Sequence, residues 1–215
     1  MREYQKIETV FERDIDGSKK LIEGKFRNSI VEYLKDNEWI FTEKVDGTNI
    51  RVVWNGHSFE FYGRTDKVSI PAFLFKKLLD IFRNNEMEQM FEQLFNDIQV
   101  MICGEGYGNR IQKVGKDYIQ DGVDLIVFDI IINDLYLKRD DVEDICNKLG
   151  LKVVPIVMTG TIQQAVDYIK SKPSSILPLS SSNCKMEGLV GMPKEPIYDR
   201  MGKRVAVKIK CKDFV

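Results

Sequence analysis

Alternating hydrophobic and polar positions predict a run of strands in the first part of the chain. The apolar stretch Trp39-Ile40-Phe41 leads into Thr42-Glu43-Lys44, and apolar runs follow at 50–54 and 58–62. Asn55-Gly56 separates the last two runs, and Asn-Gly between apolar runs is the strongest short-range signal for a hairpin. We therefore expect a strand that ends near Lys44, followed by a hairpin with His57 at the surface beside its turn.

From Pro71 onward the hydrophobic spacing changes to that of a helix. Apolar side chains recur every three or four residues between 73 and 95, which predicts a helical cover for a sheet. Pro71 is a normal opening residue for such a helix. Two further helices are expected, one at 140–149 that closes on Gly150 and one at 161–170 that is capped by Thr161.

The remaining apolar runs predict strands at 99–103, 125–132, 153–158, 186–192 and 204–212. The first of these is expected to end in a glycine-rich turn, Gly104–Gly108, that carries Glu105. Residues 172–183, rich in serine and proline, predict a loop. Strands come in clusters with helices inserted singly, and this order indicates an α+β fold with antiparallel or mixed sheets.

Composition narrows the class of protein. The chain has 215 residues, 43% of them hydrophobic, which is enough for one large domain or two small ones. The densest apolar patch, Leu125–Phe128, is interrupted by Asp129 and is too short to span a membrane. The net charge of −1 gives no general attraction to nucleic acid, so a nucleic-acid substrate would need a local cationic cluster.

Histidine and cysteine usage gives little support for metal clusters or disulfides. His57 is the single histidine, and the four cysteines lie far apart without a Cys-x-x-Cys pair. The charged amino terminus does not fit a signal peptide. We therefore expect a cytoplasmic, reducing setting.

The stretch that follows the first strong strand carries the main candidate chemistry. Because side chains on a strand alternate, Lys44 and Asp46 are expected on the same face. Gly47 allows the backbone to approach a ligand closely, and Arg51 has the side chain best shaped to bind phosphate. The residues alone fit either a binding site or a solvated hairpin.

Four other patches are candidates, each with an ordinary structural alternative. Glu105 could bind a sugar hydroxyl or a metal-bound water, or could be a simple turn carboxylate. Phe128 could stack on a base, or lie in the core. Glu187-Gly188 repeats the pattern of a carboxylate before a glycine. The lysines at 208, 210 and 212 could face a triphosphate, or protect an edge strand.

Taken in order, these patches resemble the covalent nucleotidyltransferase superfamily of ATP-dependent ligases and mRNA capping enzymes. The matching motifs are Lys-x-Asp-Gly-x-Asn-x-Arg from Lys44, Gly-Arg-Thr at 63–65, Gly-Glu-Gly at 104–106, Val-Phe-Asp at 127–129, Glu187-Gly188 and Lys-x-Lys near the end. Asn49, Arg51, Arg64 and the stretch 104–112 are most similar to the RNA ligase branch, in particular to small phage-type enzymes.

The resemblance implies a fold and a domain arrangement. The fold would be the α+β ligase adenylation fold, unrelated to ATP-grasp, with antiparallel or mixed sheets flanked by helices around a central nucleotide pocket. One such domain would span residues 1–215, and no C-terminal accessory domain is evident. An accessory RNA-binding protein or domain would then assist sealing. The setting would be the bacterial host cytoplasm for a phage-encoded chain.

The resemblance also implies a reaction. Lys44 would attack ATP to form a lysyl-AMP, AMP would pass to an RNA 5′-phosphate, and a 3′-hydroxyl would then complete the joint. Mg²⁺, with Mn²⁺ as the alternative, would be held through water by Glu105 and Glu187. The residues implied to bind the nucleotide are Glu43, Asp46, Asn49, Arg51, Arg64, Glu105, Phe128, Glu187, Lys208 and Lys210.

Two alternatives stay open at this point. The final Lys-x-Lys motif, or closing lysine pair, could be Lys210 and Lys212. Lys208 and Lys210 are favoured, because the family has an aromatic residue four positions after the second lysine and Phe214 lies four positions after Lys210. The function could instead be that of a DNA-nick ligase or guanylyltransferase with the same lysine chemistry, or of an inactive module that binds nucleic-acid ends.

Overall fold

The computed structural model describes residues 3–178, 180, 181 and 183–214. Its chain forms two compact units. Unit 1 comprises the residues up to Tyr4 together with Asp46–Val154, and unit 2 comprises Gln5–Val45 together with the residues from Pro155 onward. Unit 1 is therefore built almost entirely from one continuous segment, whereas unit 2 is assembled from two segments that are distant in sequence.

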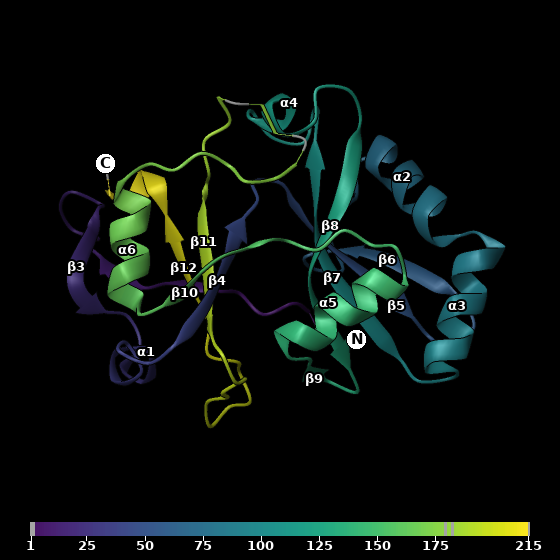
Figure 1. Ribbon diagram of the computed structural model, residues 1–215, viewed down its shortest axis with the longest axis horizontal. Coiled ribbons are helices and arrows are strands. Elements are labelled where there is room, and N and C mark those ends of the chain that lie inside the picture. Colours follow the sequence, from purple (N-terminus) through teal and green to yellow (C-terminus); the bar gives the residue numbers. More distant parts are fainter. Residues whose placement is uncertain (1–2, 179, 182, 215) are drawn as a thin grey trace. The chain divides into compact units, whose positions relative to one another are not determined.

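Unit 2 contains a mixed sheet with the strand order β1-β12-β11-β4-β10 (Figure 1). These strands are β1 (Glu8–Thr9), β12 (Val207–Lys210), β11 (Gly188–Pro193), β4 (Trp39–Lys44) and β10 (Ile156–Gly160). β1 runs parallel to β12, and the other neighbours are antiparallel. The unit also contains β2 (Phe11–Arg13) paired with β3 (Leu21–Phe26), the short helix α1 (Ser29–Tyr33) and the 3₁₀ helix η1 (Cys211–Phe214).

The two faces of this sheet have different chemistry because side chains alternate along each strand. Trp39 and Phe41 of β4 are fully buried in a hydrophobic cluster with the apolar side of helix α6 (Ile162–Lys170). Thr161 and Gln164 close a capping box at the start of α6, as the sequence predicts. The opposite face of the sheet carries Lys44 and the lysines of β12.

Unit 1 contains an antiparallel sheet with the strand order β6-β5-β7-β8-β9. Its strands are β5 (Thr48–Trp54), β6 (Phe59–Gly63), β7 (Val100–Gly108), β8 (Val123–Ile132) and β9 (Leu135–Tyr136). Helices α2 (Ala72–Phe82) and α3 (Asn85–Phe95) lie beside this sheet, with α4 (Gly115–Tyr118) and α5 (Arg139–Lys148) farther along the chain (Figure 1). Side chains of α2, α3 and α5 share one hydrophobic core with the strands.

A β-bulge changes the direction of side chains within β8. Cys103 of β7 pairs with Asp129, and the next residue, Gly104, pairs with Val127, so Phe128 is an extra residue on β8. Leu125 and Val127 before the bulge belong to the hydrophobic core, and Ile130 after it does too. The core-facing positions therefore change from odd to even numbers at Phe128.

The predicted elements are largely confirmed, with differences at their ends. The hairpin around Asn55-Gly56 forms, with His57 exposed, and the helical stretch after Pro71 divides into α2 and α3 because the Asn84 side chain caps a new helix by accepting the Met87 N–H at 2.9 Å. The strand expected at 153–158 lies at Ile156–Gly160 instead. No pattern in the sequence before residue 38 predicted β1, β2, β3 or α1.

Two strand ends near candidate residues were predicted wrongly. β7 does not stop at Cys103 but continues to Gly108, because β5 and β8 pair with it on both sides, so Glu105 lies within a strand rather than in a turn. The last strand ends at Lys210, and the chain turns there into η1. Lys212 consequently does not continue the alternation of the strand.

Candidate active site

The centre of the candidate site in unit 2 is an ion-paired cluster on adjacent strands. Lys44 on β4, Gly188 on β11 and Lys210 on β12 are directly paired in register. Glu187 precedes Gly188, and its two carboxylate oxygens accept hydrogen bonds from Lys44 Nζ at 2.5 Å and from Lys210 Nζ at 2.6 Å. The Lys44 and Lys210 side chains are 22% and 19% exposed, so water screens these pairs less than it screens pairs on an open surface.

Gly188 permits this close arrangement. A Cβ added to Gly188 would lie 2.1 Å from the carbonyl oxygen of Ile209 and 2.8 Å from the Cα of Lys210. A larger residue would therefore push β11 away from β12 and separate Glu187 from its lysine partners. The Glu-Gly pair noted in the sequence has a clear steric reason.

Lys208 lies on the same face of the sheet as Lys210, two residues earlier on β12. Burial lowers the pKa of Lys208, and the neighbouring ammonium groups of Lys210 and Lys44 lower it further. Lys212, in contrast, is exposed in η1. Lys208 and Lys210 thus share the face of the sheet that carries Lys44, whereas Lys212 lies outside the strand.

Glu43 points into unit 2 on the side of the sheet opposite Lys44. Its side chain is 1% exposed, and its carboxylate accepts hydrogen bonds from Ser175 Oγ at 2.6 Å and from the Ile176 N–H at 2.9 Å. Burial raises the pKa of Glu43, and these two hydrogen bonds oppose that shift. Ser175 and Ile176 lie in a serine-rich segment with no recognisable motif, so this contact had no signal in the sequence.

In unit 1, Asn49 and Glu105 lie directly opposite each other on β5 and β7. Their neighbour Ile50 belongs to the hydrophobic core, so alternation places Asn49 on the other face of the sheet. Within the described part of the chain, Asn49 Oδ1 is buried and accepts no hydrogen bond. A buried acceptor of this kind is costly unless a donor reaches it, and a bound ligand could supply that donor.

Asp46 and Gly47 form a tightly held turn at the start of unit 1. The Asp46 N–H donates to Tyr118 Oη at 3.3 Å, and Gln112 Nε2 donates to the Gly47 carbonyl at 2.9 Å. A Cβ on Gly47 would lie 2.3 Å from the Gly106 carbonyl oxygen, which explains the glycine. Gln112 lies in the stretch that resembles RNA ligases, whereas Tyr118 carried no sequence signal.

Arg51 is held within unit 1 and is fully buried. Its Nε donates to the Gly63 carbonyl at 2.8 Å, its guanidinium pairs with Asp66 at 2.6 Å, and its Cζ lies 5.3 Å from the centre of the Tyr62 ring. Such contacts brace β5 against β6 and the residues that follow β6. They fit a residue that positions the segment around Arg64 better than one that contacts phosphate itself.

The last two candidates of unit 1 are more accessible. Phe128, the bulged residue, is half-buried, and its ring contacts Tyr4 edge-on with centroids 5.1 Å apart. The Tyr4 hydroxyl donates to the buried Asp129 carboxylate at 2.5 Å. Arg64 is exposed just after β6 and, among the residues that are described, makes no ion pair. Arg64 is thus accessible to a ligand, and Phe128 keeps part of its surface exposed.

The acidic residues fit a cation that arrives with a ligand. Among the described residues, no group of three or more His, Cys, Asp or Glu side chains is arranged to hold a metal ion. Mg²⁺ is commonly bound by one or two carboxylates together with water and substrate phosphates. Single carboxylates such as Glu105 and Glu187 are compatible with that mode of binding.

A match to a protein family identifies the group of proteins to which this chain belongs. The RNA ligase family model matches residues 37–210, a range that contains the Lys44 cluster and every candidate of unit 1. The chain belongs to the RNA ligase family. No curated protein matches it. In the described part of this family member, no helix is long and apolar enough to cross a membrane.

Solved structures support the fold assignment. A lysine-to-alanine variant of Naegleria gruberi RNA ligase with ATP and Mn has a TM-score of 0.63 and 22% identity, covering 86% of this chain and 54% of that one. A lysine-to-methionine variant with AMP and Mn has the same score and identity, covering 85% and 52%. An aspartate-to-alanine variant without ligand has a TM-score of 0.64 and 22% identity, covering 86% and 53%.

These matches show the predicted α+β nucleotidyltransferase fold, with its mixed and antiparallel sheets. The chain spans about half the length of the solved relatives it matches. Family membership and fold are therefore established by the comparisons.

Proposed function

We propose that this chain catalyses ATP-dependent ligation of RNA through a covalent lysyl-AMP on Lys44. The observation that carries the proposal is the contact of Lys44 and Lys210 with both oxygens of Glu187 on adjacent strands. A nucleophilic lysine needs a fixed position beside cations that bind the triphosphate. Membership of the RNA ligase family supports the same chemistry.

The first step would join the Lys44 Nζ to the α-phosphorus of ATP. The N–P bond forms as the bond from the α-phosphorus to the bridging oxygen breaks, and pyrophosphate leaves with that oxygen. Lys44 must lose a proton to attack, and its hydrogen bond to Glu187 places a carboxylate where that proton can go. Lys208 and Lys210 would stabilise the charge that develops on the phosphates.

The second and third steps would transfer AMP and seal the RNA. An oxygen of the RNA 5′-phosphate attacks the phosphorus of lysyl-AMP, and the N–P bond to Lys44 breaks. The RNA 3′-hydroxyl then attacks the activated 5′-phosphate, a phosphodiester forms and AMP leaves. Each step is a phosphoryl transfer without a change of oxidation state, so it depends on positioned groups and charge rather than on a redox cofactor.

The remaining residues would bind the nucleotide or position the residues that do. We assign contact with ATP to Asp46, Asn49, Arg64, Glu105 and Phe128, and support of neighbouring segments to Glu43 and Arg51. Glu105 and Glu187 would hold Mg²⁺ or Mn²⁺ through water, and the cation would neutralise part of the triphosphate charge. The binding of ATP, AMP and Mn by the N. gruberi enzyme supports this assignment.

We further propose that the chain acts on RNA with 5′-phosphate and 3′-hydroxyl ends, in the manner of small phage-type enzymes. The support is the sequence resemblance at Asn49, Arg64 and the 104–112 stretch. In the same proposal residues 1–215 act as one adenylation domain, and an accessory RNA-binding protein or domain assists sealing.

Covalent labelling tests the proposal directly. Wild-type chain and Lys44→Ala are incubated with α-labelled ATP and Mg²⁺ and separated on a denaturing gel. We expect a label on the wild type that pyrophosphate reverses, and complete loss of the label in Lys44→Ala with circular dichroism unchanged. Label on Lys44→Ala, or none on a folded wild type, would contradict the assignment. Labelling by GTP in place of ATP would indicate a guanylyltransferase.

A further inference from the structure

The strand that carries Lys208 and Lys210, β12, is held on both of its sides. β11 pairs with it on one side, and the short edge strand β1 pairs with it on the other. The N-terminal segment, residues 8–13, comprises β1 and β2. Val10 of this segment donates its N–H to the Lys208 carbonyl at 3.3 Å. A segment in which no site residue was expected therefore lies directly beside the closing lysine pair.

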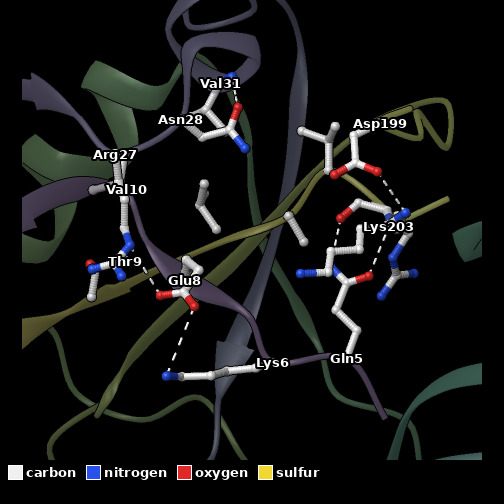
Figure 2. A pocket seen from close by; sticks show the side chains of 14 residues that line it. Gln5, Lys6, Glu8, Thr9, Val10, Arg27, Asn28, Val31, Asp199 and Lys203 are labelled. Carbon is white, nitrogen blue, oxygen red and sulfur yellow. Dashed lines mark hydrogen bonds and ion pairs between the residues drawn. The ribbon is translucent and has the colours of Figure 1, made fainter. Parts of the chain in front are cut away.

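The N-terminal segment is also anchored to Arg27, the residue that follows β3. The Arg27 Nε lies 3.2 Å from a carboxylate oxygen of Glu8, and the Arg27 N–H donates to the Val10 carbonyl at 3.1 Å. Figure 2 shows Glu8 and Arg27 as neighbours on the wall of a cavity beside β1. These contacts fix the segment to β3 as well as to β12, so the segment can serve as a support for the residues it binds.

The far end of the N-terminal segment is bound to η1, the 3₁₀ helix that follows β12. Arg13 Nη2 lies 2.7 Å from Asp213 Oδ1, and Arg13 Nη1 donates to the Lys19 carbonyl at 2.5 Å. The Asp213 side chain is only 4% exposed, and in the part of the chain that the structure describes its buried Oδ2 accepts no hydrogen bond. Because a buried charge left without its partner is strongly unfavourable, loss of Arg13 would favour a shift of η1 that exposes Asp213.

η1 is in turn joined to the Lys44 cluster through the backbone. Its first residue, Cys211, directly follows Lys210 and donates its N–H to the Glu187 carbonyl at 3.0 Å. The Glu187 carboxylate accepts the hydrogen bond from Lys210 Nζ at 2.6 Å. A shift of η1 would therefore move the backbone of Lys210 and weaken its alignment with Glu187.

We propose that Arg13 and Asp213 are positioning residues that hold Lys210 in register with Glu187 and Lys44. Their described hydrogen bonds join them to each other and to Lys19, so they act through Lys210 rather than on ATP. The inference rests on the proposed function, because Lys210 is assigned there to the phosphates of ATP. A misplacement of about 1 Å can cost on the order of 10²-fold in rate, so a small shift of η1 is enough to slow the formation of lysyl-AMP.

Rates of covalent labelling with α-labelled ATP test the proposal, with the folded fraction of each variant measured by circular dichroism. Arg13→Met keeps much of the side-chain stem but removes the ion pair, and Asp213→Ala removes the other partner. We expect each change to lower the labelling rate per folded molecule by about tenfold at saturating ATP, less than the roughly 10²–10³-fold expected for Lys210→Ala.

A double-mutant cycle separates positioning from a purely structural role. If Arg13 acts through Lys210, Arg13→Met should slow labelling little further in a chain that already carries Lys210→Ala. A purely structural role would instead give independent effects whose free energies add. The matched control is Glu12→Gln, which removes the 2.6 Å ion pair of Glu12 with Lys25 between the same two strands, β2 and β3, and should label at the wild-type rate.

Three results would overturn the proposal: additive effects in the cycle, wild-type rates in both Arg13→Met and Asp213→Ala, or an equal decrease in Glu12→Gln. If Asp213→Ala fails to fold, Arg13→Met decides the result alone.

Chemical acetylation of lysines in the full chain without ATP, measured by mass spectrometry, keeps this inference separate from the proposed function. Lys210 is bonded to Glu187 and its side chain is 19% exposed, so the reagent should reach its amine poorly in the wild type. Arg13→Met should raise acetylation of Lys210 severalfold relative to the exposed Lys148 of unit 1. That increase, with no ATP labelling of the folded wild type, would support the positioning role and contradict the ligase chemistry. Labelling of the wild type with unchanged acetylation of Lys210 in Arg13→Met would do the reverse.

Discussion

Units 1 and 2 hold their candidate residues in different ways. In unit 2 the charged residues contact one another, since Glu187 joins Lys44 to Lys210 across neighbouring strands. In unit 1 the candidate Arg51 is bound to the scaffold, and the buried Asn49 acceptor has no donor among the described residues. The candidate charges that contact one another thus lie in unit 2, whereas unit 1 holds Arg51 in scaffold contacts and keeps the Asn49 amide oxygen buried.

The largest expected effect after Lys44→Ala concerns the closing lysines. Lys210→Ala removes a cation that contacts Glu187 in the structure, so we expect the rate of covalent labelling to fall by roughly 10²–10³-fold, as for loss of one charge-stabilising donor. Lys212→Ala, at an exposed residue of η1, should label at a rate close to wild type. Quench-flow or manual time courses with labelled ATP measure both. A larger effect at Lys212 would show that the closing pair is Lys210 and Lys212.

Arg51→Met tests whether Arg51 serves the scaffold. This change keeps much of the side-chain volume but removes the charged hydrogen bonds to Gly63 and Asp66, so we expect the free energy of unfolding to fall by roughly 1.5–3 kcal/mol. The matched Lys210→Met should change stability little while it impairs labelling. Urea denaturation of both variants gives the comparison. Unchanged stability in Arg51→Met would mean that its contacts serve ligand binding rather than the fold.

Glu43 is predicted to make the stability of the fold depend on pH. Burial raises the pKa of Glu43 above its ordinary value of 4.5 in the folded chain. The associated stabilisation is fully present below the unfolded pKa and is lost as the pH rises through the folded pKa. The amide side chain of Glu43→Gln does not titrate. The stability of this variant relative to wild type should therefore rise as the pH increases from the unfolded pKa to the folded pKa of Glu43, and should stay constant above that range.

Urea denaturation at a series of pH values below, within and above this pH range measures the difference in stability. Ser175→Ala serves as a companion, because it removes one of the hydrogen bonds that oppose the shift. Parallel stability curves for wild type and Glu43→Gln would rule out the raised pKa.

The smallest expected effect on stability is that of Asn49→Leu. Replacing a buried, unsatisfied amide with an apolar group of similar size is nearly neutral or slightly stabilising. Labelling should nevertheless weaken, with most of the change in the concentration of ATP that gives half-maximal rate. If Asn49→Leu unfolds the chain while labelling per folded molecule is unchanged, the amide serves the fold and not the nucleotide.

Much of the fold was predictable because its signals are local. The Asn55-Gly56 turn, the Thr161 cap and the Gly150 stop each depend on a few adjacent residues. The strand ends near Glu105 and Lys212 were missed because pairing with neighbouring strands decides them. The contact of Glu43 with Ser175 joins residues far apart in sequence and could not be anticipated from either stretch.

The candidate residues were named from the sequence by resemblance, whereas their mutual contacts were not. Lys44, Glu187 and Lys210 could be chosen individually, but their meeting depends on the register of β4, β11 and β12. The burial of Arg51 could not be predicted from the sequence either, because it depends on contact with Asp66, which lies beyond the hairpin.

The extra residue at Phe128 shifts the alternation of side chains along β8 by one position, as an inserted letter shifts a reading frame. Every residue of β8 after it has its inward and outward assignment exchanged relative to an uninterrupted strand. Deleting Phe128 would therefore restore an uninterrupted register with Asp129 still outward and Ile130 still inward, whereas keeping Phe128 and losing the bulge would turn Asp129 toward the hydrophobic core and Ile130 away from it. A hydrophobicity plot of β8 should accordingly be interpreted as two strands in opposite phase that are joined at one aromatic residue.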